Sequence, residues 1–204
     1  MSGARLILVR HAEPHEEVRD RIYGRLDPEL SEHGRAHAAA IAAELADEPI
    51  AVVYTSPRLR ARATAAPLAA RLGLEPRVED ELREIDFGEL EGLTLAEAVE
   101  RYPDESRWMA APAAALFPGG ESVATLRARA IAATGVIAAR HEGETAAVFS
   151  HAVVIRAILV DALAMAPDAM FRLDLSYGGI SVVEWFDAAR DPVTASLAVA
   201  AAWR

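Results

Sequence analysis

Residues 5–14 read Arg-Leu-Ile-Leu-Val-Arg-His-Ala-Glu-Pro, a short apolar run followed at once by polar side chains. An apolar run of this length without alternation is typical of a strand that is buried on both faces of a mostly parallel sheet. The polar residues behind it would then lie at the carboxyl edge of the sheet, where ligands bind in α/β proteins. His11 is therefore the first candidate functional residue.

Strand and helix patterns alternate along the rest of the chain, which favours an α/β fold. Ser31 is a plausible helix N-cap and Gly73 a plausible helix end. The segment 90–120, punctuated by proline and glycine, is expected to be a lid-like insertion in a single domain of 204 residues. Strands are expected at 50–54, 145–149, 180–186 and 196–201, and helices at 31–46, 58–72, 94–101, 121–140 and 153–164.

Composition excludes several classes of function. The 21 basic and 31 acidic residues give a net charge of −10, which argues against non-specific binding to nucleic acid or to an anionic membrane. The absence of cysteine and lysine excludes disulfides, thiolate nucleophiles, Schiff bases and P-loops. The first apolar run is too short for a signal peptide or a membrane span, so a cytoplasmic protein is expected, with a homodimer as the default assembly.

Three more motifs follow predicted buried strands or lie near them. Ser150-His151-Ala152 follows the strand at 145–149, and Ser56-Pro57-Arg58-Leu59-Arg60-Ala61 follows the strand at 50–54. Leu82-Arg83-Glu84-Ile85 supplies a carboxylate in an apolar setting. Arg60 is the candidate arginine, with Arg58 and Arg62 as alternatives. Glu84 is the candidate carboxylate, with Glu81, Asp86 and Glu89 as alternatives.

Two histidines, paired arginines and a glutamate suit phosphoryl transfer from a phosphomonoester. A neutral imidazole can attack phosphorus and form a phosphohistidine. Arginine forks and a second, protonated histidine can hold the phosphoryl oxygens, so no metal ion is required. A glutamate that stays protonated in a semi-buried site can protonate the leaving oxygen and later deprotonate water.

In this order the motifs resemble the histidine phosphatase superfamily, also called the phosphoglycerate mutase-like family. Arg10-His11-Ala12-Glu13 is similar to its Arg-His-Gly signature, which implies that His11 is the phosphorylated nucleophile and Arg10 a phosphate ligand. The resemblance implies that Arg60 is the second phosphate-binding arginine, Glu84 the acid and base, and His151 the second histidine of the phosphate pocket. Tyr23, Gly24 and Arg83 are further candidates for substrate binding.

The resemblance also implies a fold and an activity. The expected fold is a three-layer α/β/α sandwich with a mostly parallel central sheet. The expected activity is that of a metal-independent phosphomonoesterase, without a cofactor, acting on a small phosphorylated metabolite through a phosphohistidine on His11. The alternatives are a cofactor-dependent phosphoglycerate mutase, for which 204 residues is short, and a non-catalytic module that binds phosphorylated ligands.

Some positions depart from the family pattern or allow another interpretation. Ala12 and Ala152 replace commoner glycines, which is tolerable unless the backbone there needs a positive φ. Glu17 stands where many members carry a phosphate-contacting asparagine, and an acid there would repel a phosphate. The histidines at 33 and 37 have the spacing of a metal pair, although an exposed helix face is favoured. The segment 118–122, Pro-Gly-Gly-Glu-Ser, reads equally well as a phosphate cradle or a plain turn.

Overall fold

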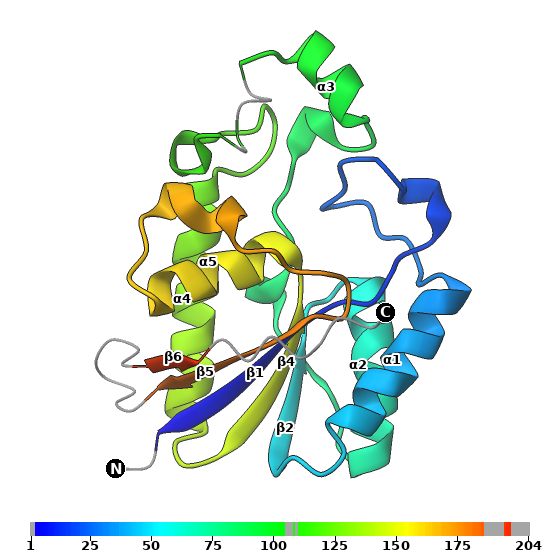
Figure 1. The fold of residues 1–204 in the computed structure, drawn as a ribbon, viewed down its shortest axis with the longest axis vertical. Coiled ribbons are helices and arrows are strands. Elements are labelled where there is room, and N and C mark those ends of the chain that lie inside the picture. Colours follow the sequence, from blue (N-terminus) through cyan, green and yellow to red (C-terminus); the bar gives the residue numbers. More distant parts are fainter. Residues whose placement is uncertain (1–2, 105–107, 109, 186–193, 197–204) are drawn as a thin grey trace.

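A six-stranded sheet in the order β3-β2-β4-β1-β5-β6 forms the centre of the fold (Figure 1). The computed structural model describes residues 3–104, 108, 110–185 and 194–196. The first four strands along the chain run parallel, whereas β5 is antiparallel to β1 and β6 is antiparallel to β5. The predicted mostly parallel sheet is therefore confirmed. The strands are β1 (Ala4–Arg10), β2 (Ile50–Thr55), β3 (Arg77–Val78), β4 (Thr145–Ser150), β5 (Ile180–Trp185) and β6 (Thr194–Ser196).

Helices cover both faces of this sheet. Figure 1 shows α1 (Glu32–Glu44) and α2 (Leu59–Leu72) on one side, and α4 (Val123–Arg140) and α5 (Ala152–Ala162) on the other. Successive β1 side chains point to opposite faces, so Ile7 packs in the cluster that includes α1 and α2, and Leu8 in the cluster with α4 and α5. The unbroken apolar run of β1 follows from this burial on both faces, and the expected α/β/α sandwich is confirmed.

Most predicted helix ends lie within two residues of the observed ones. Ser31 caps α1, since its Oγ accepts the Gly34 N–H at 2.8 Å. Gly73 ends α2 in the left-handed conformation, with φ of 66°. The helix expected from 121 begins at Val123, because Ser122 is its N-cap.

The insertion expected at 90–120 carries α3 (Leu95–Arg101), which lies beyond the carboxyl edge of the sheet (Figure 1). Trp108 and Phe117 anchor the insertion, with ring centroids 5.6 and 4.9 Å from that of Phe87. Besides α3 and β3, the described part of the segment 76–120 contains the short 3-10 turns η2 (Asp80–Leu82), η3 (Gly88–Leu90) and η5 (Pro112–Ala114).

The last predicted strand is only partly open to comparison. β6 begins at Thr194, two residues before the expected start. Positions 197–201 of this predicted strand and position 186 of the preceding one lie outside the described residues. Among the described residues, no helix combines the length and the apolar character that a membrane crossing needs.

Candidate active site

The two candidate histidines meet because the strands that precede them are neighbours. β1 and β4 pair in parallel with Arg10 opposite Ser150, so His11 and His151 leave the sheet side by side. Their ring centroids are 5.2 Å apart, and both residues are almost fully buried. The His11 N–H also donates to the Ser150 carbonyl at 2.9 Å. The two histidines therefore lie together at the carboxyl edge of the sheet.

The imidazole of His11 is held as a neutral ring with one free nitrogen. Its Nδ1 lies 2.8 Å from the Ala12 carbonyl oxygen, which can only accept, so Nδ1 carries the proton and Nε2 keeps its lone pair. Burial, and then the positive charges of Arg60 and Arg10, hold the pKa of His11 well below its ordinary value. Near neutral pH, the Nε2 lone pair is therefore available as a nucleophile.

His151 contacts a hydroxyl at one ring nitrogen and no protein group at the other. The Ser56 hydroxyl accepts the Arg58 backbone N–H and lies 2.7 Å from His151 Nε2, to which it can donate its own proton. His151 Nδ1 is buried and has no partner among the described residues. Burial, with Arg60 as the largest charge contribution, holds the pKa of His151 well below its ordinary value. This shift favours the neutral form of His151, whereas the protonated second histidine expected from the sequence remains a prediction.

Arg60 lies in the first turn of α2, and its side chain is completely buried. Its guanidinium donates to the carbonyl oxygens of Leu26 (2.8 Å) and Gly24 (3.0 Å), and it lies 3.6 Å from Asp27 Oδ1. The segment 23–27 therefore fixes the position of the guanidinium. Burial lowers the pKa of Arg60, and the Glu84 carboxylate opposes that shift.

Arg10 is held from the opposite side, by the segment before β5. Its Nη1 donates to the Leu175 carbonyl oxygen, and its Cζ lies 4.0 Å from the centre of the Tyr177 ring. Buried N–H groups without a partner in the described part of the chain include Nε of Arg10, Arg58 and Arg60. Since buried donors are normally satisfied, donors of this kind around two neutral imidazoles fit an anionic ligand.

Glu84 is the buried carboxylate of the site. Its Oε1 accepts the Ile85 N–H at 3.0 Å and its Oε2 the Val153 N–H at 3.3 Å. Burial raises the pKa of Glu84, and these two hydrogen bonds and the charges of Arg60 and Arg10 limit the rise. By contrast, the exposed Glu89 accepts a hydrogen bond from the Tyr102 hydroxyl. The environment of Glu84 suits a carboxyl group that holds its proton.

The three candidates for substrate binding have different positions. Tyr23 lies beside the site, with its ring centroid 6.3 Å from that of His11. Gly24 acts through its backbone, since its carbonyl oxygen binds Arg60 and its N–H donates to Glu91. The guanidinium of Arg83 instead pairs with Asp80 and Glu81, both at 3.3 Å, so its predicted contact with substrate remains a prediction.

The structure explains why Glu17, Ala12 and Ala152 can depart from the family pattern. Glu17 is exposed on a short 3-10 turn (Glu16–Val18), beside His15 and away from the two buried imidazoles. Among the described residues, the positive φ angles outside glycine occur at Asp20 and Ala164, so Ala12 and Ala152 are tolerated. No group of three or more potential metal-ligating side chains occurs in the described ranges.

Sequence reasoning missed Tyr177. Its hydroxyl lies 2.8 Å from that of Tyr23, and its ring centroid lies 5.5 Å from that of His11. The next residue, Gly178, donates its N–H to the His11 carbonyl at 3.1 Å. The glycine pair at 178–179 before an apolar strand was the available signal, but using it requires knowing that β5 runs antiparallel beside β1.

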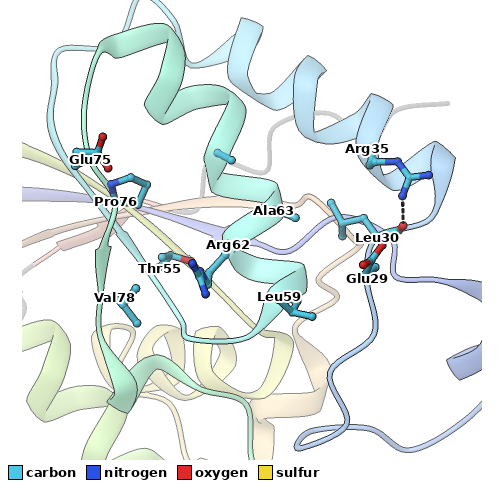
Figure 2. Close-up of a pocket in the computed structure, with 11 residues that line it drawn as sticks. Glu29, Leu30, Arg35, Thr55, Leu59, Arg62, Ala63, Glu75, Pro76 and Val78 are labelled. Atoms are coloured by element: carbon cyan, nitrogen blue, oxygen red, sulfur yellow. Dashed lines mark hydrogen bonds between the residues drawn. The ribbon is translucent and has the colours of Figure 1, made fainter.

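A separate surface pocket of about 510 Å³ lies along the outer side of α2 (Figure 2). Leu59 and Arg62 of α2 face Val78 of β3 across it, and Arg35 donates to the Leu30 carbonyl oxygen at its far end. None of the predicted site residues lines this pocket. This pocket and the histidine site are therefore lined by different residues.

Comparison with known proteins agrees with this site. The profile of the histidine phosphatase superfamily (branch 1) matches residues 6–196. The chain belongs to this family. Phosphoserine phosphatase 1 of Hydrogenobacter thermophilus is 40% identical over 155 residues, covering 76% of this chain and 74% of that protein. The 2,3-bisphosphoglycerate-dependent phosphoglycerate mutase 2 of Gloeobacter violaceus is 32% identical over 185 residues, covering 85% and 82%.

Solved structures extend the likeness to nearly the whole chain. The native mycobacterial glucosyl-3-phosphoglycerate phosphatase superposes with a TM-score of 0.84 at 27% identity, covering 96% of this histidine phosphatase and 97% of that chain. Mycobacterial relatives that are 37% identical over 183 residues are longer, and the chain spans about half of their length. The expected enzyme class is confirmed: this is a phosphatase of the histidine phosphatase family, a phosphomonoesterase.

Proposed function

We propose that this phosphatase hydrolyses a small phosphomonoester in two steps, through a phosphohistidine on His11 and without a metal ion. The observation that carries the proposal is the pair of buried neutral imidazoles, 5.2 Å apart, with buried guanidinium donors around them. A dianionic phosphoryl group satisfies those donors, and its charge is balanced by Arg10 and Arg60.

In the first step, the His11 Nε2 lone pair attacks phosphorus and forms a P–N bond. The P–O bond to the leaving group breaks, and Glu84 gives its proton to the leaving oxygen, so an alcohol departs. The guanidinium groups of Arg10 and Arg60 and the Nδ1–H of His151 bind the phosphoryl oxygens as charge builds on them. Arg58, whose Nε is also buried, adds a third guanidinium group.

In the second step, water attacks phosphorus while the Glu84 carboxylate takes its proton. The P–N bond breaks, inorganic phosphate leaves, and both His11 and Glu84 return to their starting protonation states. Because the step uses the same carboxyl group in its other protonation state, a pKa above the ordinary carboxyl value serves both halves of the reaction.

L-Phosphoserine is the first substrate to test. The 40% identity to phosphoserine phosphatase 1 of Hydrogenobacter thermophilus supports this choice. The mycobacterial glucosyl-3-phosphoglycerate phosphatase, at 27% identity, is a weaker guide to the substrate. Both names describe phosphorylated small molecules with a carboxylate, so 3-phosphoglycerate belongs in the same panel.

The second candidate function is a phosphoglycerate mutase, which the relative from Gloeobacter violaceus favours. A mutase returns the phosphoryl group to substrate, whereas a phosphatase passes it to water. With 3-phosphoglycerate and a trace of bisphosphoglycerate, release of inorganic phosphate supports the phosphatase, and isomerised product supports the mutase.

The deciding experiment is hydrolysis of p-nitrophenyl phosphate by the wild type and by His11→Ala, both in excess EDTA. We expect activity that resists chelation in the wild type and is absent in the variant. Rapid quenching with labelled substrate should trap an acid-labile, base-stable phosphoryl group in the wild type. Activity that survives in His11→Ala would overturn the assignment of the nucleophile.

A further inference from the structure

The loop that carries Glu84 is bound from behind by one arginine of α4. The guanidinium of Arg129 donates to three carbonyl oxygens of this loop, those of Glu81 at 2.6 Å, Arg83 at 2.8 Å and Glu84 at 3.3 Å. Its side chain is 8% exposed. A single buried side chain therefore fixes the backbone at Glu84 and just before it.

The remaining donors of the same guanidinium bind one carboxylate. Arg129 Nε and Nη2 lie 2.7 and 2.8 Å from the two oxygens of Glu121, a bidentate pair in which the Glu121 side chain is 10% exposed. Such a pair sets the plane of the guanidinium as well as its position. Glu121 thereby aims the remaining N–H groups of Arg129 at the loop.

The turn that precedes Glu121 is built to sit against the other end of the same loop. The Glu121 N–H donates to the Asp86 carbonyl at 2.9 Å. A Cβ placed on Gly120 would lie 2.4 Å from that carbonyl oxygen, and one on Gly88 would lie 2.0 Å from the Pro118 carbonyl oxygen. Only glycine allows so close an approach at positions 120 and 88, and the φ of 65° at Gly119 also favours glycine. The segment 118–122 thus docks against the loop that carries Glu84.

We propose that Arg129 and Glu121 are positioning residues for the general acid, an inference that rests on the proposed function of Glu84. Neither residue is offered as a contact to substrate. Their role is to hold the Glu84 backbone so that its carboxyl group stays buried and in line with the leaving oxygen. Since general acid catalysis requires hydrogen-bond distance to the leaving oxygen, a shift of about 1 Å can cost as much as 100-fold in rate.

The test is the ratio of two kcat/KM values, one for p-nitrophenyl phosphate and one for an alkyl monoester such as phosphoserine. The p-nitrophenolate leaves without a proton, whereas an alkoxide needs one, so loss of the general acid lowers the alkyl value selectively. Both values come from the same preparation, so partial unfolding of a variant cancels in the ratio. The value of kcat/KM does not depend on the later hydrolysis of the phosphoenzyme, because it reports only the steps up to departure of the leaving group.

We expect Arg129→Lys to lower kcat/KM for phosphoserine, relative to kcat/KM for p-nitrophenyl phosphate, by roughly 10- to 100-fold. Lysine keeps the charge but cannot bind three carbonyls and a carboxylate in one plane. Glu121→Gln, which keeps an acceptor and the side-chain shape, should give a smaller change in the same direction. Arg127→Lys is the matched control, because Arg127 lies on the same helix and faces Asp161 at 3.9 Å.

Glu84→Gln distinguishes the role of Glu84 as general acid from the positioning role of Arg129 and Glu121. If Glu84→Gln itself leaves the alkyl-to-aryl ratio unchanged, the proposed role of Glu84 fails, whatever Arg129 does. If Glu84→Gln lowers the ratio but Arg129→Lys and Glu121→Gln do not, the positioning role alone is overturned. If both lower it, the double variant should lose little more than Glu84→Gln alone, since the same contribution is removed twice.

Discussion

Ser56 Oγ lies 2.7 Å from His151 Nε2, so a hydroxyl at the end of β2 orients the imidazole at the end of β4. The Ser56 oxygen accepts the Arg58 N–H, and when its own proton is donated to His151 Nε2 the ring proton of a neutral imidazole lies on Nδ1. Through this hydrogen bond, a residue that need not touch substrate can favour the tautomer in which His151 Nδ1 donates to a phosphoryl oxygen.

Removing this hydroxyl should weaken catalysis without unfolding the protein. We expect Ser56→Ala to lower kcat/KM by about two- to tenfold, the value of one hydrogen bond. Thr134→Val is the control, because Thr134 is also fully buried and its hydroxyl bonds only to carbonyls within α4. Equal kcat/KM values for the two variants would show that the tautomer of His151 does not depend on Ser56.

The pKa shifts of His11 and Glu84 run in opposite directions, and the reaction needs both. At ordinary pKa values, a carboxyl group would lose its proton before an imidazole became neutral. Burial lowers the pKa of His11 and raises that of Glu84, so a neutral nucleophile and a protonated acid can exist together. One property of the site, its exclusion from water, produces both states.

This coexistence predicts a bell-shaped pH profile of kcat/KM for an alkyl monoester. The acid limb reports loss of the His11 proton at a pH well below 6.5, and the alkaline limb reports ionisation of Glu84 above 4.5. In Glu84→Gln, the rate should be low and the limb contributed by Glu84 should be missing. Ionisation of the substrate is common to both proteins, so an identical alkaline limb in the variant would contradict the assignment.

A prediction at Gly24 tests how Arg60 is held. A Cβ at Gly24 would lie 1.8 Å from the Ile85 carbonyl oxygen, while its own carbonyl binds Arg60. Gly24→Ala should therefore destabilise the protein by about 1–3 kcal/mol and raise KM. Gly135→Ala is the control, since no atom lies within 4 Å of a Cβ there and an alanine inside α4 should stabilise by about 1 kcal/mol. Urea unfolding and steady-state kinetics check both variants.

The parts of the site that could be predicted from the sequence are those that the sheet itself positions. His11 and His151 each follow an unbroken apolar run, and parallel strands place their carboxyl ends at one edge. Arg60 could be predicted for the same reason, because α2 starts directly after β2. The sequence pattern identifies these residues since regular structure determines where their backbones go.

The positions of Arg83, Tyr177 and Arg129 depend on tertiary structure that the local sequence pattern does not encode. Arg83 precedes Glu84 in an extended stretch, where neighbouring side chains point to opposite sides, so a buried Glu84 directs Arg83 outward. Tyr177 reaches the site only because β5 is antiparallel to β1, a direction that an apolar run does not encode. Arg129 could not be assigned from sequence, since its partners are backbone carbonyls far away in the chain.

The buried histidines also predict how stability depends on pH. His11 has a folded-state pKa well below 6.5, so below that pH the unfolded chain binds a proton that the folded chain excludes. Its contribution to stability is therefore present above pH 6.5 and is lost as the pH falls toward the folded-state pKa. Glu84, with a raised pKa, acts in the opposite direction, since its contribution is present below 4.5 and is lost as the pH rises.

A variant comparison isolates the histidine contribution from that of Glu84. The free energy of unfolding of the wild type minus that of His11→Gln should fall by as much as about 2 kcal/mol between pH 6.5 and pH 5, since one proton is taken up on unfolding over that range. His151→Gln should show a difference of the same sign, because burial also depresses the pKa of His151. Urea unfolding at several pH values measures both differences. Parallel curves for the wild type and both variants would mean that folding does not depress the pKa of either imidazole, which would contradict the effect of burial assigned to them.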